Sequence, residues 1–179
     1  DHVLKSMNRK HDSHSLQALI DNLHARIGGL VLRTTLMVGY PGESEEDFQN
    51  LYDFVAENEF DWLGAFCFAA EEGTPAADMP GQVPEEVKQQ RRDAIMGLQQ
   101  GISRNKNMQH LNKNEKILIS SQISNNLYLG RGYFQAPDVD GVTIVKSQTR
   151  LVKGNFVNVL LKGIRDYDMI GEATDEHSE

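Results

Sequence analysis

The chain has one cysteine in 179 residues, Cys67, which excludes an internal disulfide and fits a reducing compartment. No window holds eighteen apolar residues, and no basic–apolar–small signal opens the sequence. We therefore expect a soluble, cytoplasmic protein that makes no contact with a membrane. The six histidines show neither His-x-His nor HExxH spacing, so the sequence predicts no metal site.

Positive charge is also scarce. Lysine and arginine number 18 against 26 aspartates and glutamates, which gives a formal net charge of −8. Residues 1–106 carry a net −7 and residues 107–179 a net −1. Neither part has the basic field of a protein that grips phosphate backbones, so the charge favours a basic protein as partner over a nucleic acid.

The first part of the chain begins with helix and strand patterns in turn. Apolar residues recur at helical spacing over residues 15–27, and a Gly-Gly pair follows them. Residues 30–38 have the composition of a strand. Ser44 and Asp47 then stand at the two positions of a capping box, which predicts the start of a second helix.

The same alternation continues further along. Residues 61–69 form a near-continuous apolar run, which is typical of a strand buried on both faces. Pro84 opens a long helix whose period extends to about residue 108. Two strand–helix units in series predict parallel strands joined by right-handed crossovers.

After residue 110 the pattern changes to short strands separated by turns, of which Asp140-Gly141 is one. Five such strands in succession predict a small antiparallel barrel. We therefore expect an α/β part at 1–110, a barrel at 111–174 and a disordered tail at 175–179. The expected strands are residues 116–121, 126–134, 141–145, 155–161 and 169–173.

The segment LRTTLMVGYPGE, residues 32–43, is the most informative stretch. It has the pattern of a strand that stops at Gly39 and turns through Pro41-Gly42 into a helix. Such strand ends hold ligands in many α/β proteins, because glycine lets the backbone approach the ligand and the next helix offers free N–H groups. An ordinary turn without a ligand fits these twelve residues equally well.

Three motifs, in order, resemble the radical-SAM methylthiotransferases. They are LKSMNRKH at 4–11, LRTTLMVGYPGESEEDF at 32–48 and EEGTPAADMPGQVPEEVKQQR at 71–91. The match runs over residues 3–173, and its last part is similar to a TRAM domain, which has an OB-like fold. The resemblance implies the C-terminal part of a radical-SAM (βα) barrel followed by the TRAM barrel. A start at Asp1 instead of Met also suggests a fragment.

The resemblance implies S-adenosylmethionine (SAM) and two [4Fe–4S] clusters as cofactors. Each cluster is held by three cysteines in this family, whereas this chain has only Cys67. The cluster ligands are therefore expected outside the chain, which by itself should be inactive. We expect no catalytic acid, base or nucleophile and no metal ligand among its residues.

The resemblance also implies which residues lie beside SAM. Gly39, Pro41, Gly42 and Glu43 match the motif that borders the adenosine portion of SAM in this family. Two arginines are candidates for the SAM carboxylate, with open alternatives: a structural ion pair for Arg33 and a solvent-exposed position for Arg9. Phe66 and Phe68 are predicted to share one strand face, which packs on adenine or in the core. The predicted SAM-side residues are Arg9, Arg33, Gly39, Pro41, Gly42, Glu43 and Phe68.

The segment GRGYFQAPDVDGVTIV, residues 130–145, resembles the RimO-type members, which modify an aspartate of ribosomal small-subunit protein twelve. Tyr133, Asp138 and Asp140 are the expected substrate contacts, since carboxylates in a turn suit a basic protein loop and repel RNA phosphate. Asp140 and Gly141 also fit a turn that only shapes a hairpin.

Other functions stay open. One is a tRNA-adenosine methylthiotransferase of the same family, and another is a different radical-SAM enzyme with an appended barrel. A third is an RNA-binding module, with contact to RNA possible but not favoured by the charge. Its stacking candidates are Tyr128, Tyr133 and Phe134, beside Arg131.

Overall fold

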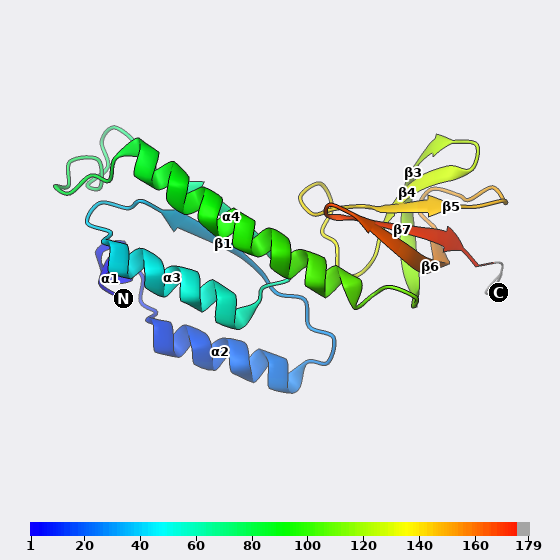
Figure 1. Ribbon diagram of the computed structural model, residues 1–179, viewed down its shortest axis with the longest axis horizontal. Coiled ribbons are helices and arrows are strands. Elements are labelled where there is room, and N and C mark those ends of the chain that lie inside the picture. The colour runs from blue at the N-terminus through cyan, green and yellow to red at the C-terminus, as the bar shows by residue number, and fades with distance from the viewer. Residues whose placement is uncertain (175–179) are drawn as a thin grey trace. The chain divides into compact units, whose positions relative to one another are not determined.

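The computed structural model describes residues 1–174, and the tail predicted at 175–179 lies outside the described residues. The chain divides into two compact units, Asp1–Gln99 and the residues from Gln100 onward. This division falls inside the long helix α4 (Glu85–Met108), shown in Figure 1, and a domain boundary near residue 110 stays a prediction. None of the helices in the described part is long and apolar enough to cross a membrane.

The first unit is built around two parallel strands. β1 (Arg33–Val38) and β2 (Trp62–Cys67) pair with Val38 opposite Cys67, which confirms the predicted parallel arrangement. Both strands therefore end at the same edge of the sheet, and the loops toward α3 (Glu45–Asn58) and α4 leave from that edge. The two preceding helices are α1 (His2–Ser6) and α2 (Ser13–Arg26).

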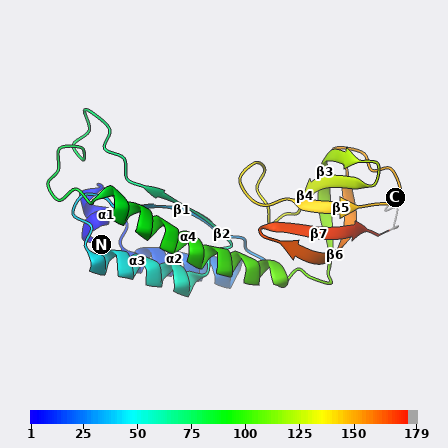
Figure 2. The ribbon, with the colours of Figure 1, turned by 45° about the horizontal axis from the view of Figure 1, so that its top comes forward.

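The two faces of this sheet differ. Val38 is fully buried, whereas Met37 is 43% exposed and Phe66, its partner on β2, is 61% exposed. The expectation that β2 is buried on both faces is therefore wrong. The helices pack on one face of the two strands (Figure 2), and within residues 1–174 the other face, which carries Phe66, is left largely uncovered. Parallel strands are normally covered on both faces, so Met37 and Phe66 mark a surface suited to further protein or a ligand.

Helix α3 begins with the predicted capping box. The Ser44 hydroxyl accepts from the Asp47 N–H at 3.1 Å, and the Asp47 carboxylate accepts from the Ser44 N–H at 2.9 Å. Glu45 and Glu46 add negative charge to the first turn, where the helix dipole favours it. These contacts fix the residue at which the loop after β1 becomes helix.

Ser44→Ala should lower the free energy of unfolding by about 1 kcal/mol, because the Asp47 N–H loses its acceptor at the helix start. Chemical denaturation followed by circular dichroism measures the change. Ser44→Thr keeps a hydroxyl acceptor, so its free energy of unfolding should differ from that of the original protein by only a few tenths of a kcal/mol. An equal loss in both variants would contradict the capping role.

The second unit contains a closed barrel of five strands in the order β3–β4–β5–β7–β6. Four neighbouring pairs are antiparallel, but β5 and β7 run parallel, with Thr143 opposite Met169. The small antiparallel barrel predicted from the sequence is confirmed. It contains one parallel pair because an odd number of strands cannot alternate in direction around a closed ring. The strands are β3 (Asn114–Ser124), β4 (Leu127–Arg131), β5 (Thr143–Lys146), β6 (Phe156–Arg165) and β7 (Asp168–Ala173).

The barrel has an apolar core. Along the strands, the buried residues alternate with half-buried or exposed ones, as expected for a small barrel filled by side chains. The buried apolar side chains are Ile117, Ile119, Tyr128, Val145, Val159, Leu161 and Met169.

Candidate functional site

The loop after β1 is a compact turn held by backbone hydrogen bonds. Gly39 and Gly42 have φ of +75° and +83°, the left-handed region that glycine adopts most easily. The Gly42 N–H donates to the Gly81 carbonyl at 2.9 Å, and the Glu43 N–H donates to the Tyr40 carbonyl at 2.9 Å. The segment before α4, which contains Gly81, thus joins the loop after β1 at the carboxyl edge of the sheet.

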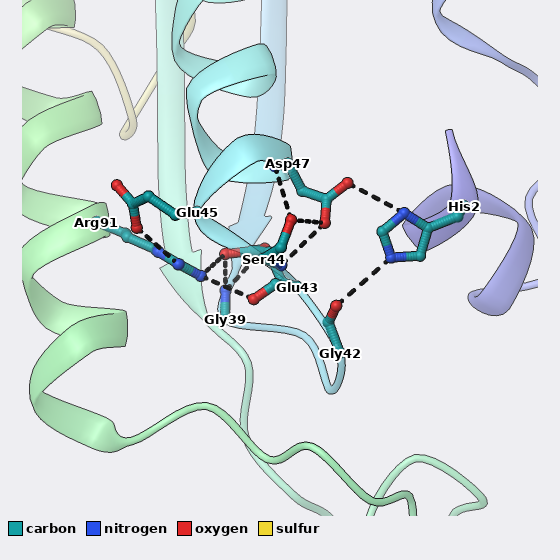
Figure 3. A network of polar contacts seen from close by, with 8 residues as sticks. All are labelled: His2, Gly39, Gly42, Glu43, Ser44, Glu45, Asp47 and Arg91. Atoms are coloured by element: carbon teal, nitrogen blue, oxygen red, sulfur yellow. Dashed lines mark hydrogen bonds and ion pairs between the residues drawn. The ribbon is translucent and has the colours of Figure 1, made fainter.

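The Glu43 side chain is buried beneath this turn. Both of its carboxylate oxygens lie 3.0 Å from the Gly39 backbone nitrogen, which donates to them. Arg91 of α4 donates to the same carboxylate at 2.7 Å, and its other terminal nitrogen donates to Glu45 at 3.0 Å (Figure 3). The Glu43 and Arg91 side chains are 5% and 7% exposed, so the two charges face each other away from solvent. The Glu43 carboxylate therefore stabilises the loop after β1 from its buried side.

A second cation of α4 lies behind the loop. Lys88 donates from its Nζ to the Phe68 carbonyl at 3.0 Å, and its ammonium lies 5.4 Å from the centre of the Phe68 ring. A Cβ added at Gly39 would lie 2.3 Å from the Lys88 Cγ. The Lys88 side chain therefore fills the space that any other residue at position 39 would need.

Phe68 follows β2 and is packed in the interior. Its ring meets Tyr40 edge-on, with centroids 5.3 Å apart and planes at 72°. Its N–H donates to the Val38 carbonyl at 2.8 Å and so extends the pairing of the two strands. Of the two phenylalanines predicted to share a face, Phe66 is open to solvent and Phe68 is buried with Tyr40.

His2 contacts the same loop from α1, which the sequence did not indicate. Its Nδ1 lies 3.0 Å from an Asp47 carboxylate oxygen, and its Nε2 lies 3.4 Å from the Gly42 carbonyl (Figure 3). Burial raises the pKa of Asp47, but hydrogen bonds from Ser44 and the nearby His2 lower it by more, so this pKa lies below its usual value. No spacing rule connects residues 40 positions apart.

The structure does not bring all predicted SAM-side residues together. Gly39, Pro41, Gly42, Glu43 and Phe68 meet at the carboxyl edge of the sheet.

Of the two predicted arginines, Arg33 lies apart from that edge. Arg33 begins β1, six residues before Gly39, which is ~20 Å at 3.3 Å per residue of strand. It is exposed and alternates with Thr35 and Met37 on the open face of the sheet. Arg9 is exposed just after α1, and its backbone N–H donates to Leu4.

The loop fits a flat, partly apolar ligand. Gly42 is exposed, and a Cβ built there would meet no atom within 4 Å, so the backbone can be approached from outside. Met37 and Phe66 are exposed, each one residue before its strand ends, and offer apolar surface on the open face. This arrangement suits the adenosine part of SAM. Within residues 1–174 no group of three or more His, Cys, Asp or Glu side chains is placed to hold a metal.

In the second unit the two predicted aspartates differ in role. Asp138 is exposed, with φ of +66°. Asp140 accepts a hydrogen bond from the Ala136 N–H at 2.8 Å, so its carboxylate braces the turn that presents Asp138. Tyr133 is 65% exposed and contacts the ring of Phe134 edge-on at 5.4 Å.

An open hollow of about 600 Å³ lies beside Tyr133 on the outside of the barrel. Leu118 of β3 lies between Arg131 of β4 and Phe156 of β6, its partners on the two neighbouring strands. Phe156 is 66% exposed, so the hollow has two accessible aromatic rings. Tyr128 and Phe134 are buried, and the expectation that they offer stacking surfaces is wrong because both rings fill the interior.

Comparison with known proteins identifies relatives along the whole chain. Residues 113–174 match the TRAM domain. The chain is 57% identical over 95% of its length to "Ribosomal protein uS12 methylthiotransferase RimO" of Syntrophomonas wolfei, of which it covers 39%. It is 45% identical over 100% of its length to the protein of the same name from Acetivibrio thermocellus, covering 40% of it. The corresponding protein of Aquifex aeolicus is 43% identical over 98% of the chain. The chain spans about two-fifths of the length of these relatives.

Proposed function

From this chain's membership of the RimO family of methylthiotransferases, with 42–57% identity along nearly all of its residues, we propose that the full-length protein modifies ribosomal protein uS12. The reaction adds a methylthio group to the β-carbon of an aspartate. The observation that carries the proposal is the continuity of the match, which includes both the glycine loop of the first unit and the TRAM barrel of the second.

SAM and two [4Fe–4S] clusters are the proposed cofactors, and they supply the radical, sulfur-transfer and methyl-donor chemistry when bound. This chain's residues hold and orient SAM. Gly39, Pro41 and Gly42 border its adenosine part, and Glu43 acts from beneath by holding the Gly39 N–H. Phe68 supports the loop from behind through Tyr40.

The arginines have separate proposed roles. Arg9 is the proposed charge partner of the SAM carboxylate, since it is exposed and always cationic. Arg33 lies ~20 Å along β1 from Gly39, so a structural ion pair is the role proposed for it. The cysteine ligands of the clusters belong to other parts of the full-length protein. The apolar pair Met37 and Phe66 then faces the interior of a completed barrel.

Tyr133, Asp138 and Asp140 form the proposed substrate side. Asp138 projects a carboxylate from a turn that Asp140 braces, and Tyr133 offers an exposed ring a few residues away. A basic loop of a ribosomal protein is complementary to this charge, and such complementarity raises the association rate and selects the partner. The protein would act in the cytoplasm, where ribosomes are assembled.

Asp138→Lys should reduce kcat/KM for uS12 at least tenfold, because it places like charge against a basic substrate. SAM cleavage without uS12 should stay unchanged, since Asp138 lies in the other unit from the glycine loop. The measurement is methylthiolation of purified uS12 by the full-length protein reconstituted with its clusters. Asp166→Lys is the matched control, because Asp166 is also exposed with φ of +54° in a turn of the same barrel. Equal losses in the two variants would remove the recognition role of Asp138.

The reaction itself is tested with the same reconstituted protein, SAM and a chemical reductant, offered uS12 or unmodified tRNA. We expect a methylthio group on the uS12 aspartate and none on tRNA. Modification of the tRNA adenosine would replace the proposed substrate with that of the related tRNA enzymes.

A further inference from the structure

We infer that Lys88 and Arg91 of α4 are positioning residues that shape the loop after β1 for SAM, an inference that rests on the proposed function. The two residues lie three positions apart, so they project from one face of the helix. Both are 7% exposed, although lysine and arginine are rarely buried unless they are paired. Each reaches a different loop at the carboxyl edge of the sheet.

Arg91 sets the loop after β1 through Glu43. Its guanidinium donates to the Glu43 carboxylate at 2.7 Å and to the Glu43 carbonyl at 3.3 Å. The carboxylate, held in this way, accepts the Gly39 N–H with both oxygens. The Arg91 guanidinium also lies 5.3 Å from the ring centre of Phe48 in the first turns of α3. One side chain thus connects α4, the turn and the start of the following helix (Figure 3).

Lys88 holds the loop after β2 in place and restricts which residue can stand in the loop after β1. Its Nζ donates to the Phe68 carbonyl at 3.0 Å, and the Glu85 carboxylate lies 3.5 Å from the same nitrogen. Its alkyl chain passes under Gly39 so closely that only glycine fits there. Phe68 in turn pairs with the Val38 carbonyl, so Lys88 acts on the ends of both strands.

A purely stabilising role explains this arrangement poorly. Replacing a buried ion pair by apolar residues of similar volume is often neutral or favourable for stability, because desolvating two charges is costly. Buried polar groups that are paired instead favour one geometry. Both terminal nitrogens of Arg91 are paired in this way, although its Nε has no hydrogen-bond partner among the described residues. The geometry specified here is that of the Gly39–Glu43 turn, whose exposed Gly42 borders SAM in the proposed function. We therefore expect the two cations to affect SAM affinity more than folding.

The test measures equilibrium binding of radiolabelled SAM to the full-length protein with its clusters reconstituted. Arg91→Gln should raise the Kd for SAM at least tenfold, and Arg91→Lys should have a smaller effect because it keeps the charge without the fork of donors. Arg92→Gln is the matched control: Arg92 is the next residue, its side chain is 41% exposed, and it pairs with Asp93. Its Kd should stay within twofold of the original protein.

A double variant separates positioning from stability. Arg91→Gln alone leaves the Glu43 charge buried without its partner, which is destabilising. Glu43→Gln together with Arg91→Gln removes both charges, so the Tm should recover while the Kd for SAM stays at least tenfold raised. If affinity returns along with the Tm, the pair acts only through stability and the inference is wrong. If the original protein itself fails to bind SAM, the proposed function fails instead.

Discussion

Gly39→Ala should abolish most SAM binding, with a Kd raised at least thirtyfold, and should lower the free energy of unfolding by about 3 kcal/mol. Two costs combine. An L-residue at φ of +75° is strained by ~1–2 kcal/mol. The new Cβ would also lie 2.3 Å from the Lys88 Cγ, near the base of a buried side chain that cannot swing away without losing its bond to Phe68. Either Lys88 leaves its place or the turn changes shape.

Gly73→Ala provides the matched control for that experiment. Gly73 has φ of +79°, but a Cβ built there meets no atom within 4 Å. It therefore shares the backbone strain of Gly39→Ala without the collision. We expect unchanged SAM affinity and a loss of ~1–2 kcal/mol in stability. Equal SAM affinities for the two variants would show that the close approach to Lys88 has no bearing on the site.

Gly141→Ala is expected to have the largest effect on the barrel, with a loss of at least ~3 kcal/mol in the stability of the second unit. The added Cβ would lie 2.1 Å from the carbonyl oxygen of Tyr167 and 2.6 Å from its carbon. Backbone cannot rotate away as a side chain does, so the segment before β5 must separate from the turn that leads into β7. The contacts disrupted include the Val142 N–H to Asp168 at 2.8 Å.

Hydrogen exchange of the barrel amides measures this change in the full-length protein. Gly163→Ala is the control within the same barrel, because its Cβ would meet only Ile170, at the ordinary distance of 3.7 Å. We expect protection in β5 and β7 to fall by more than a hundredfold in Gly141→Ala and to stay near its original value in Gly163→Ala. Similar protection in the two variants would contradict the packing described for Gly141.

Local features were predictable from the sequence because their causes are local. The Ser44 and Asp47 capping box joins residues three apart, and Pro84 precedes α4 by one position. The order of elements follows from hydrophobic period and turn residues. The resemblance of residues 32–48 to a known motif placed Gly39 at the strand end, where the structure has it.

The remaining features depend on contacts between distant parts of the chain. Arg91 meets Glu43 across 48 positions, and Lys88 reaches Phe68 across 20, so neither has a spacing signature. From the sequence alone, Lys88 and Arg91 look like ordinary charged residues on the solvent-facing side of a helix. Their burial was the signal, and burial is known only once α4 is placed against the strand ends.

The exposure of individual side chains could not be predicted from the sequence either. Phe66 stands in an apolar run that predicts burial, yet it is 61% exposed because the sheet has two strands and one open face in the described residues. In the barrel, the sequence offers both Asp138 and Asp140 as substrate contacts, with a turn-shaping role as the alternative for Asp140. The structure separates an exposed carboxylate from one bonded to the Ala136 N–H.

The most direct test of the proposed function compares cells with and without the gene by mass spectrometry of uS12 and of digested tRNA. The proposal predicts that uS12 loses a methylthio group from one aspartate when the gene is removed, while the tRNA nucleosides stay unchanged. An unchanged uS12 mass, with loss of the methylthio group from a tRNA adenosine, would contradict it.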